Sequence, residues 1–271
     1  MLLPAVSSIA PLPSGVVGIA ASVLQVVVLC SSYTAERTSP SEYSKFASLK
    51  VDTLKTPISS QQGMLIIYTP ATIAAALYTF LGQSSLSSDT MFSSSLVAPL
   101  LFILFFKRVA EVTWLHKYSG QMPLQQAVLI GSVYTFYTIE IASNAVSLGS
   151  NDPVWSTLGL NLFVIGILGN LYHHYLLANL RQNNNAPKDA KRYRPPVGGL
   201  FSLVATPHYL FELVAWFGIA CVAQQVNAFL VFGTISAYLV ARAQNTDDFY
   251  KSKFGPEEWP RTKKALIPGL F

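Results

Sequence analysis

The chain has 271 residues, of which 51% are hydrophobic and only 11% are charged, and its formal net charge is +5. A soluble domain carries about 25% charged residues, so this composition excludes an ordinary soluble protein and indicates a membrane protein. The basic residues form no continuous patch in a soluble domain, which argues against nucleic-acid binding, and Cys30 and Cys221 both lie in apolar runs, which argues against a disulfide framework.

Seven apolar segments follow one another along the chain, each close to the length of about 20 residues that a helix needs to cross a bilayer. They are residues 14–33, 63–82, 92–114, 124–148, 154–180, 200–223 and 226–246. The first segment lacks a basic region before it and an obvious cleavage site, so we interpret it as a retained helix. The sequence therefore predicts an all-α membrane protein with seven transmembrane helices in one bundle.

The basic residues predict the orientation of this bundle. All 18 Lys and Arg residues lie in the loops after the first, third and fifth segments, in the tail, or at adjoining helix ends. By the positive-inside rule the carboxy terminus is cytosolic and the amino terminus is lumenal. Membrane topology alone would explain the basic residues in the loops. It does not explain Lys107, Arg108 and Arg242, which lie within or at the ends of apolar segments.

A polar stripe runs along the fifth apolar segment. On a helix, Asn170, His174, Leu177 and Arg181 fall on one face. Polar side chains at membrane depth usually face a cavity, a partner or a substrate path. The stripe therefore predicts a binding site at the cytosolic end of this helix.

Other apolar segments carry polar groups as well, mostly in their cytosolic halves. They are Lys107, Arg108 and Glu111, then Glu140, then His208 and Glu212, and finally Arg242 followed by Thr246 and Tyr250. We expect most of these groups to share a ligand, because otherwise several helices would bury polar groups toward one face without a common purpose. The alternative is that pairs such as Lys107 and Glu111 only neutralise each other.

The histidines do not predict a metal site. His173 and His174 are adjacent, so they point about 100° apart on a helix and cannot hold one ion together. The chain has four histidines in total, whereas di-iron membrane oxygenases use many. It also lacks the glycine-rich motifs that cradle phosphates, so a dinucleotide would be held by side chains from helix ends and loops.

An ordered series of motifs runs from about Val154 to Phe271. It comprises Asn170 to Arg181, Tyr193-Arg194, Gly198-Gly199-Leu200-Phe201, Pro207-His208-Tyr209-Leu210-Phe211-Glu212, Arg242, Tyr250, and Lys264-Ala265-Leu266-Ile267-Pro268. This series resembles the steroid 5α-reductase family of 3-oxo-5α-steroid 4-dehydrogenase-like membrane reductases. The first half is similar more loosely, through Tyr43-Ser44-Lys45, Gly63-Met64-Leu65 and Phe106-Lys107-Arg108.

The resemblance implies a multi-pass enzyme of the endoplasmic reticulum that uses NADPH to reduce a carbon–carbon double bond conjugated to a carbonyl. It implies one membrane domain over residues 1–271, with 1–150 as a four-helix substrate-side half and 151–271 as a three-helix cofactor-binding half. The implied cofactor-binding residues are Asn170, His174, Arg181, Tyr193, Arg194, His208, Glu212, Arg242, Tyr250, Arg108 and Lys45. Three residues depart from the family pattern: His174 replaces an Asp, Thr246 a His and His208 an Asn.

The substrate side departs further from the family. Steroid-reducing members hold the substrate carbonyl with a Glu on the second helix and a Tyr on the third, where this chain has Gln61 or Gln62 and Phe105. A glutamine can donate a hydrogen bond and a phenylalanine cannot. The catalytic candidates are therefore Gln62, Gln61 and Tyr68, with Tyr209 as a further replacement donor.

Several functions stay open. The expected substrate is a 3-oxo-4-ene steroid or a related lipid, and a 2-enoyl-CoA or polyprenol-type substrate is the alternative within the superfamily. A seven-helix receptor or transporter would spread its polar groups along a path or around an outward-facing pocket. A membrane methyltransferase would bind S-adenosylmethionine in a similar cytosolic pocket. We expect neither a metal nor a nucleic acid as a partner.

Overall fold

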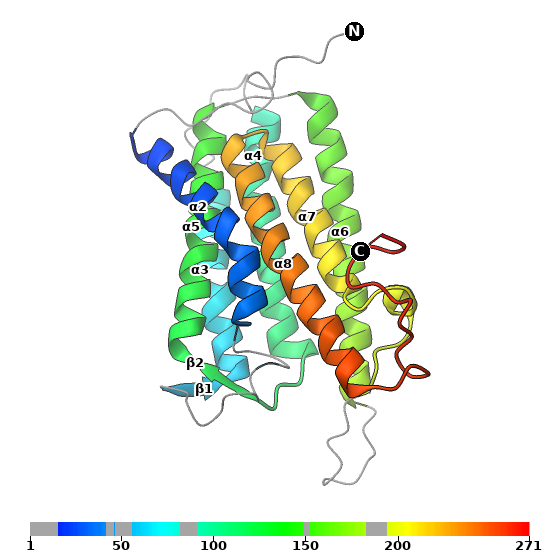
Figure 1. Ribbon diagram of the computed structural model, residues 1–271. Coiled ribbons are helices and arrows are strands. Elements are labelled where there is room, and N and C mark those ends of the chain that lie inside the picture. Colours follow the sequence, from blue (N-terminus) through cyan, green and yellow to red (C-terminus); the bar gives the residue numbers. More distant parts are fainter. Residues whose placement is uncertain are drawn as a thin grey trace.

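The computed structural model describes residues 16–41, 46, 56–81, 91–148, 152–182 and 194–270. These residues form helices that run alternately up and down one bundle (Figure 1). The helices are α2 (Val16–Thr38), α3 (Ser60–Leu81), α4 (Met91–Ala110), α5 (Leu124–Leu148), α6 (Pro153–Gln182), α7 (Pro207–Ala223) and α8 (Val226–Lys253). The π-helical turn η5 (Glu111–Leu115) extends α4, and the 3₁₀ turn η6 (Gly199–Ser202) precedes α7.

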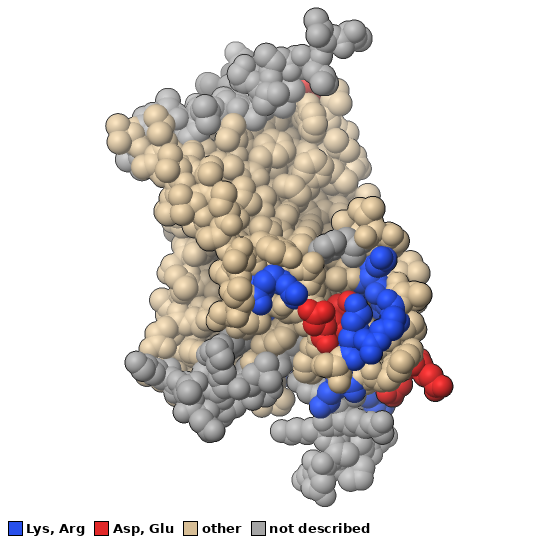
Figure 2. Space-filling view, viewed as in Figure 1, with Lys and Arg blue, Asp and Glu red and all other residues tan. Residues whose placement is uncertain are grey.

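Four of the described helices are long and apolar enough to cross a membrane, over Gly18–Thr38, Ser60–Leu81, Pro153–Leu180 and Val226–Lys253. Large apolar side chains also face outward, such as Phe80, which is 72% exposed, and Leu168, which is 60% exposed. Figure 2 shows that most of the visible charged residues gather in the lower half of the bundle, below a broad and almost uncharged surface. The prediction of an all-α membrane protein is thus confirmed, while the count of seven spans and the orientation stay predictions.

Two features of the structure were not predicted from the sequence. The sixth apolar segment is predicted from residue 200, but helix α7 begins only at Pro207. Proline is favoured in the first helical turn, because the backbone N–H that it lacks would have no partner within the helix there. The residues before it form η6 and an extended stretch. A short antiparallel pair of strands, β1 (Pro57–Ser59) and β2 (Gln121–Pro123), was also not predicted, and it ties the start of α3 to the start of α5.

Helices α6 and α7 pack closely, because glycines let their backbones meet. A Cβ atom at Gly166 would lie 2.4 Å from the backbone nitrogen of Ala215, and one at Gly218 would lie 2.6 Å from the carbonyl oxygen of Gly159. Small residues at such spacing are typical of close helix contacts in membranes. The contact brings the polar stripe of α6 against the first turns of α7.

The carboxy-terminal segment packs beside the residues that precede α7 (Figure 1). The Ala205 N–H donates to the Lys264 carbonyl at 2.8 Å, and the Lys264 N–H donates to the Leu203 carbonyl at 3.1 Å. Leu266 and Trp259 are completely buried. This pairing places the motif around Leu266 beside the residues that follow the motif around Gly199.

Candidate functional site

Polar side chains from four helices meet in what we call the inner cluster, at the end of the bundle where α4 and α6 end. Glu111, Asn170 and His174 are each less than 5% exposed, and Glu212 is 8% exposed. The inner cluster consists of Tyr68 on α3, Lys107, Arg108 and Glu111 on α4 and η5, Asn170 and His174 on α6, and Glu212 on α7.

Arg108 lies at the centre of the inner cluster. Its Nη2 donates to the Tyr68 hydroxyl at 3.0 Å and lies 3.7 Å from Glu212 Oε2. Its Nη1 lies 3.2 Å from Glu111 Oε2 and 3.0 Å from His174 Nδ1. The guanidinium fork therefore connects α3, α6 and α7 to the end of α4, which the point charge of a lysine would not do with the same geometry.

Lys107 and Asn170 extend the cluster toward α7. Lys107 Nζ lies 2.8 Å from Glu111 Oε1 and also donates to Asn170 Oδ1. Asn170 Nδ2 donates to the His208 carbonyl at 2.7 Å. The Lys107–Glu111 pair considered from the sequence does form, but as part of a network in which two cations face the two carboxylates of Glu111 and Glu212.

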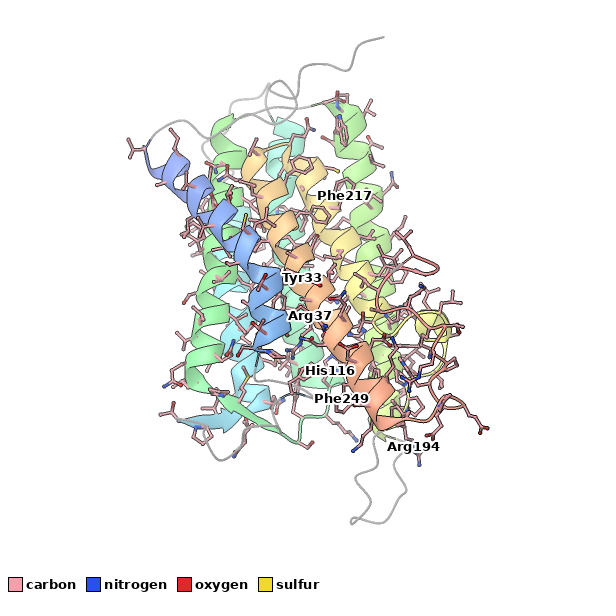
Figure 3. The ribbon with its side chains drawn as sticks, viewed as in Figure 1. Tyr33, Arg37, His116, Arg194, Phe217 and Phe249 are labelled. Atoms are coloured by element: carbon pink, nitrogen blue, oxygen red, sulfur yellow. The ribbon has the colours of Figure 1, made fainter. Side chains whose placement is uncertain are left out.

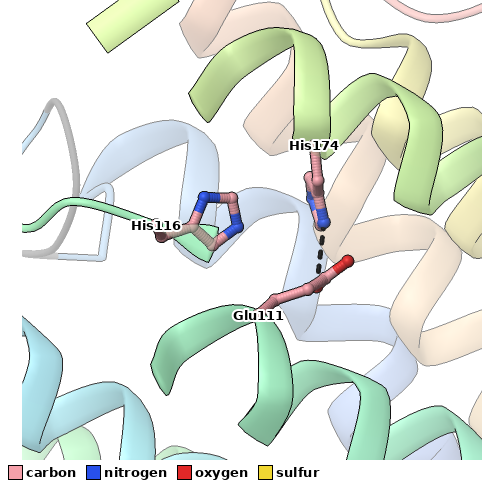
Figure 4. Close-up of side chains that lie close together, drawn as sticks. All are labelled: Glu111, His116 and His174. Carbon is pink, nitrogen blue, oxygen red and sulfur yellow. Dashed lines mark ion pairs between the residues drawn. The ribbon is translucent and has the colours of Figure 1, made fainter. Parts of the chain in front are cut away.

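The π-helical turn at the end of α4 adds His116 to this region. The His116 N–H donates to the Glu111 carbonyl at 2.8 Å, which closes a turn one residue wider than an α-helical turn. Glu111 and His116 thereby reach the same side, and the His116 and His174 rings lie 5.2 Å apart (Figure 4). Turns of this kind occur frequently at functional sites.

Glu111, His116 and His174 also form a group that the sequence does not predict, because His116 lies far from His174 along the chain. Their potential ligand atoms all lie within 4.8 Å of one another. Arg108 Nη1, however, already lies at hydrogen-bond distance from both Glu111 and His174. A metal ion would have to compete with a guanidinium for the same atoms, so we assign no metal to this group.

Tyr68 lies where the inner cluster meets the apolar core. Its ring is 6.1 Å from the Tyr134 ring, which in turn is 5.4 Å from Phe105. Phe105 is buried against Trp216 and precedes Arg108 by one helical turn. The Tyr68 oxygen accepts a hydrogen bond from Arg108, and the part of the chain that the structure describes offers no acceptor for the phenol proton. That proton is available to a ligand.

Gln61 and Gln62 are exposed at the start of α3. Gln62 Oε1 accepts from the Ser59 backbone N–H at 3.2 Å, while Ser59 Oγ accepts from the Gln62 N–H at 3.2 Å. This reciprocal arrangement is a capping box. Gln61 Nε2 donates to the Val112 carbonyl at 3.2 Å. Both glutamines thus have hydrogen bonds that fix a helix end, and their catalytic role stays a prediction.

The remaining predicted cofactor residues are spread over a wider region. Arg242 is 1% exposed and pairs with Glu36 of α2. The Tyr250 ring packs against Trp259 at 4.5 Å, and Arg194 is exposed. The structure thus brings together only part of the predicted set.

The structure does not describe the side chains of three predicted cofactor residues. Lys45 and Tyr193 lie outside the described residues, and so does the side chain of Arg181.

Glu140 does not join the inner cluster, although the sequence placed it among the intramembrane polar groups. Its carboxylate accepts hydrogen bonds from Gln25 on α2 and Asn227 on α8. Asn227 is the second residue of α8, whereas the inner cluster lies where α4 ends. Glu140 therefore links three helices at a separate place in the bundle.

His173 holds the loop before α7 against α6. Its Nδ1 donates to the Gly169 carbonyl at 2.7 Å, and its Nε2 accepts from the Leu200 N–H at 3.1 Å. Its ring stacks on Phe211 with centroids 5.2 Å apart. These contacts give His173 a structural role, which the sequence does not predict.

We expect Gly199→Ala to destabilise the protein. Gly199 has a φ of +50°, and an added Cβ would lie 2.8 Å from His173 Nε2. A left-handed backbone costs a non-glycine residue about 1–2 kcal/mol, and the clash with His173 adds to that. Thermal unfolding in detergent should show a lower midpoint, whereas Gly255→Ala, where nothing lies within 4 Å of the added atom, should unfold as the wild type does. Equal midpoints for the two variants would contradict this.

A comparison with known proteins agrees with the motif series. The family model described as 3-oxo-5-alpha-steroid 4-dehydrogenase matches residues 121–271, which is more than half of the chain. This range contains most of the predicted cofactor residues.

Curated relatives match with different coverage. The very-long-chain enoyl-CoA reductase of Dictyostelium discoideum is 29% identical over 177 residues, which cover 62% of this chain and 55% of that protein. The steroid 5-alpha-reductase DET2 of Solanum lycopersicum is 30% identical over 159 residues, covering 56% of this chain and 59% of that protein. The human 3-oxo-5-alpha-steroid 4-dehydrogenase 1 is 27% identical over 255 residues, covering 92% and 93%.

The first two matches span little more than half the length of those relatives, and the third spans nearly all of it. The family match covers the paired motifs around Gly199 and Leu266, and it also covers Asn170, His174 and Glu212 of the inner cluster. The chain therefore belongs to the 3-oxo-5-alpha-steroid 4-dehydrogenase family.

Proposed function

We propose that this protein is an NADPH-dependent reductase of a carbon–carbon double bond conjugated to a carbonyl in a lipid, with a 3-oxo-4-ene steroid as the substrate. Relatives named steroid 5-alpha-reductase and 3-oxo-5-alpha-steroid 4-dehydrogenase support the class. The observation that carries the proposal is the inner cluster, in which a buried arginine and a tyrosine with an available proton lie beside an apolar core.

The residues present fit a pyridine nucleotide. Arg108 Nε is a buried donor and Glu212 Oε2 a buried acceptor, and neither has a hydrogen-bond partner among the described residues. A carboxamide and ribose hydroxyl groups offer acceptors and donors that complement such atoms. We propose that Asn170, His174, Glu212 and Arg108 contact the nicotinamide half, with the His208 backbone beside them.

The phosphates require other cations. Within the inner cluster, Lys107 and Arg108 already face two carboxylates, so the cluster offers little net positive charge. We therefore propose that the phosphates contact Arg194, which is exposed, and that Arg181, Tyr193, Arg242, Tyr250 and Lys45 complete the site. Arginine forks suit phosphate oxygens because they donate in pairs.

The substrate side of the mechanism rests on Tyr68. NADPH, when bound, supplies a hydride to the β-carbon of the enone. Negative charge then develops on the carbonyl oxygen, and we propose that the Tyr68 O–H donates to that oxygen while Arg108 holds the phenol in place. Buried Phe105 and Trp216 keep water away, which strengthens the hydrogen bond. Tyr209 is the further candidate, since its hydroxyl also contacts an arginine, Arg242, which can only donate and so leaves the phenol proton to a ligand.

We further propose that all seven helices cross the membrane of the endoplasmic reticulum, with the amino terminus lumenal and the carboxy terminus cytosolic. Arg37, Lys107, Arg108, Lys251 and Lys253 support this orientation, because they lie in the last turns of α2, α4 and α8. Residues 1–150 would then form the substrate-side half and 151–271 the cofactor-binding half.

Microsomes that contain the protein should reduce a 3-oxo-4-ene steroid when NADPH is supplied. The panel should include enones, 2-enoyl thioesters and a polyprenol, and microsomes without the protein serve as the control. NADPH consumption and product mass are measured together. If no member of the panel is reduced and purified protein does not bind NADPH, the proposal is wrong.

A 2-enoyl thioester is the second candidate substrate. It is favoured by the match to a protein named very-long-chain enoyl-CoA reductase and by Phe105, which cannot donate to a steroid carbonyl. A receptor or transporter is disfavoured, because the inner cluster gathers near one end of the bundle and does not line a path through it. The same panel distinguishes these functions.

A further inference from the structure

Two segments outside the long helices carry large apolar side chains at the protein surface. They are residues 197–206, before α7, and residues 259–270, after α8. We call them the paired loops, because a backbone bridge joins Val204 to Lys264. Their exposed apolar side chains are Val197, Leu203, Ile267 and Leu270.

Exposed aromatic residues mark the level of a membrane surface on η5 and α6. Trp114 is 78% exposed, and Tyr172 and Tyr175 are about half exposed. Tryptophan and tyrosine are enriched where the hydrocarbon layer meets water. From Pro153, where α6 begins, to Tyr172 the helix rises by about 30 Å, which matches the thickness of the hydrocarbon layer. A membrane surface therefore lies near Tyr172.

The paired loops lie at the same level. An added Cβ atom at Gly199 would lie 2.9 Å from the Tyr172 ring, so the first loop passes beside that tyrosine. Figure 3 places Arg194, which leads into this loop, in the lower part of the bundle, whereas Phe217 of α7 lies in the upper part. The second loop turns back from the end of α8 and runs beside the first (Figure 1).

The second loop is basic as well as apolar. From Trp259 to Leu270 it contains Arg261, Lys263 and Lys264 and no acidic residue. Arg261 and Lys264 are exposed, while Lys263 Nζ lies 3.8 Å from the centre of the Trp259 ring. Such a mixture matches a bilayer surface, because anionic headgroups attract basic side chains and acyl chains accept apolar ones.

We propose that the paired loops bind the membrane surface, with Arg261 and Lys264 on anionic phospholipid headgroups and with Ile267 and Leu270 among the upper parts of the acyl chains. A free phosphate ion would satisfy the basic side chains but leave the apolar ones in water, so the lipid fits better. The contact does not depend on the reaction that the protein catalyses.

The paired loops also support the start of α7. The N–H and the hydroxyl of Thr206 both donate to the Ala265 carbonyl, at 3.2 and 2.8 Å. Leu210 and Leu213 of α7 pack against the buried group that contains Ala265 and Leu266. A membrane contact at the paired loops is thereby connected to α7, the helix that carries Glu212 of the inner cluster.

The first test measures the depth of residue 270 in a membrane. The full chain with Cys30→Ser and Leu270→Cys is labelled with a fluorophore at position 270, since the remaining cysteine, Cys221, is buried. In vesicles of phosphatidylcholine and phosphatidylserine, a lipid with a spin label near the ester end of its acyl chain should quench this fluorophore strongly.

Glu257→Cys in the same Cys30→Ser background is the matched control. Glu257 is exposed in the turn beyond the end of α8, and α8 is about 40 Å long, which exceeds the thickness of the hydrocarbon layer. A fluorophore at position 257 should therefore be quenched little. Quenching at position 270 that is no stronger than at position 257 would overturn the inference.

The second test varies the charge of the headgroups. Thermal unfolding of the full chain is compared in nanodiscs of phosphatidylcholine with and without phosphatidylserine. The wild-type midpoint should be higher with phosphatidylserine, and added salt should reduce the difference. The double variant Arg261→Gln, Lys264→Gln should lose the difference, whereas Lys253→Gln, which removes an exposed charge at the end of α8, should keep it.

Three results of this second test would overturn the inference. The first is a wild-type midpoint that is equal in the two membranes, and the second is a double variant that keeps the full difference. The third is a rise of the midpoint by inorganic phosphate in pure phosphatidylcholine that equals the rise by phosphatidylserine, because the basic side chains would then bind a free ion.

Discussion

Replacing Tyr68 by Phe is expected to lower the turnover of an enone substrate by about 10²–10³-fold, the range measured when one donor to a developing oxyanion is removed. The ring and its packing are retained, so the fold and NADPH affinity should change little. The loss should appear in kcat, because the hydrogen bond strengthens as charge develops on the carbonyl oxygen. Steady-state kinetics with the best substrate of the panel, together with an NADPH titration, measure both quantities.

Tyr78→Phe is the control for this experiment. Tyr78 lies on α3, as Tyr68 does, and packs against the same apolar core. It should retain wild-type turnover. If Tyr68→Phe also retains wild-type turnover, Tyr68 is not the donor, and Gln61 and Gln62 become the candidates to examine.

Arg108→Met is expected to have the largest effect on stability, lowering the free energy of unfolding by about 3–5 kcal/mol. The substitution removes the partner of Glu212 and one of two cations beside Glu111, and it leaves the Tyr68 hydroxyl without its donor. Turnover should fall as well, because Tyr68 is no longer held. Thermal unfolding in detergent and the enone assay measure the two effects.

Arg37→Met provides the contrast for Arg108→Met. Arg37 pairs with Asp248 at 2.9 Å at the protein surface, where an ion pair contributes about 0–1 kcal/mol. Arg108→Lys tests the guanidinium itself, since it keeps the charge but loses the fork. An unfolding midpoint for Arg108→Met equal to that of Arg37→Met would show that the inner cluster does not stabilise the fold.

Some of the site could be predicted because it follows helical spacing. Asn170 and His174 share a face in any α-helix, and they do meet Lys107 and Arg108 in the inner cluster. Other contacts depend on how the helix ends are built. Gln62 is predicted as a carbonyl donor, and its place three residues after Ser59 also makes it part of a capping box, in which its oxygen accepts.

The contact between Glu111 and His116 could not be predicted from helical spacing either. The contact needs a π-helical turn, and no feature of the sequence predicts one. The same is true of Glu36, because nothing in the local pattern says which arginine a lone carboxylate will meet across the bundle.

The sequence by itself determined that this is a helical membrane protein of the 3-oxo-5-alpha-steroid 4-dehydrogenase family, since apolar segment lengths and motif order are local properties that need no knowledge of packing. Only the tertiary structure decided which polar groups share a site. It separated Glu140 from the inner cluster, joined Arg242 to Glu36, and placed the Tyr68 hydroxyl on Arg108. Helical periodicity gives the face of each helix but not the rotation and depth at which two helices pack, and in this bundle glycine contacts and buried ion pairs fix both.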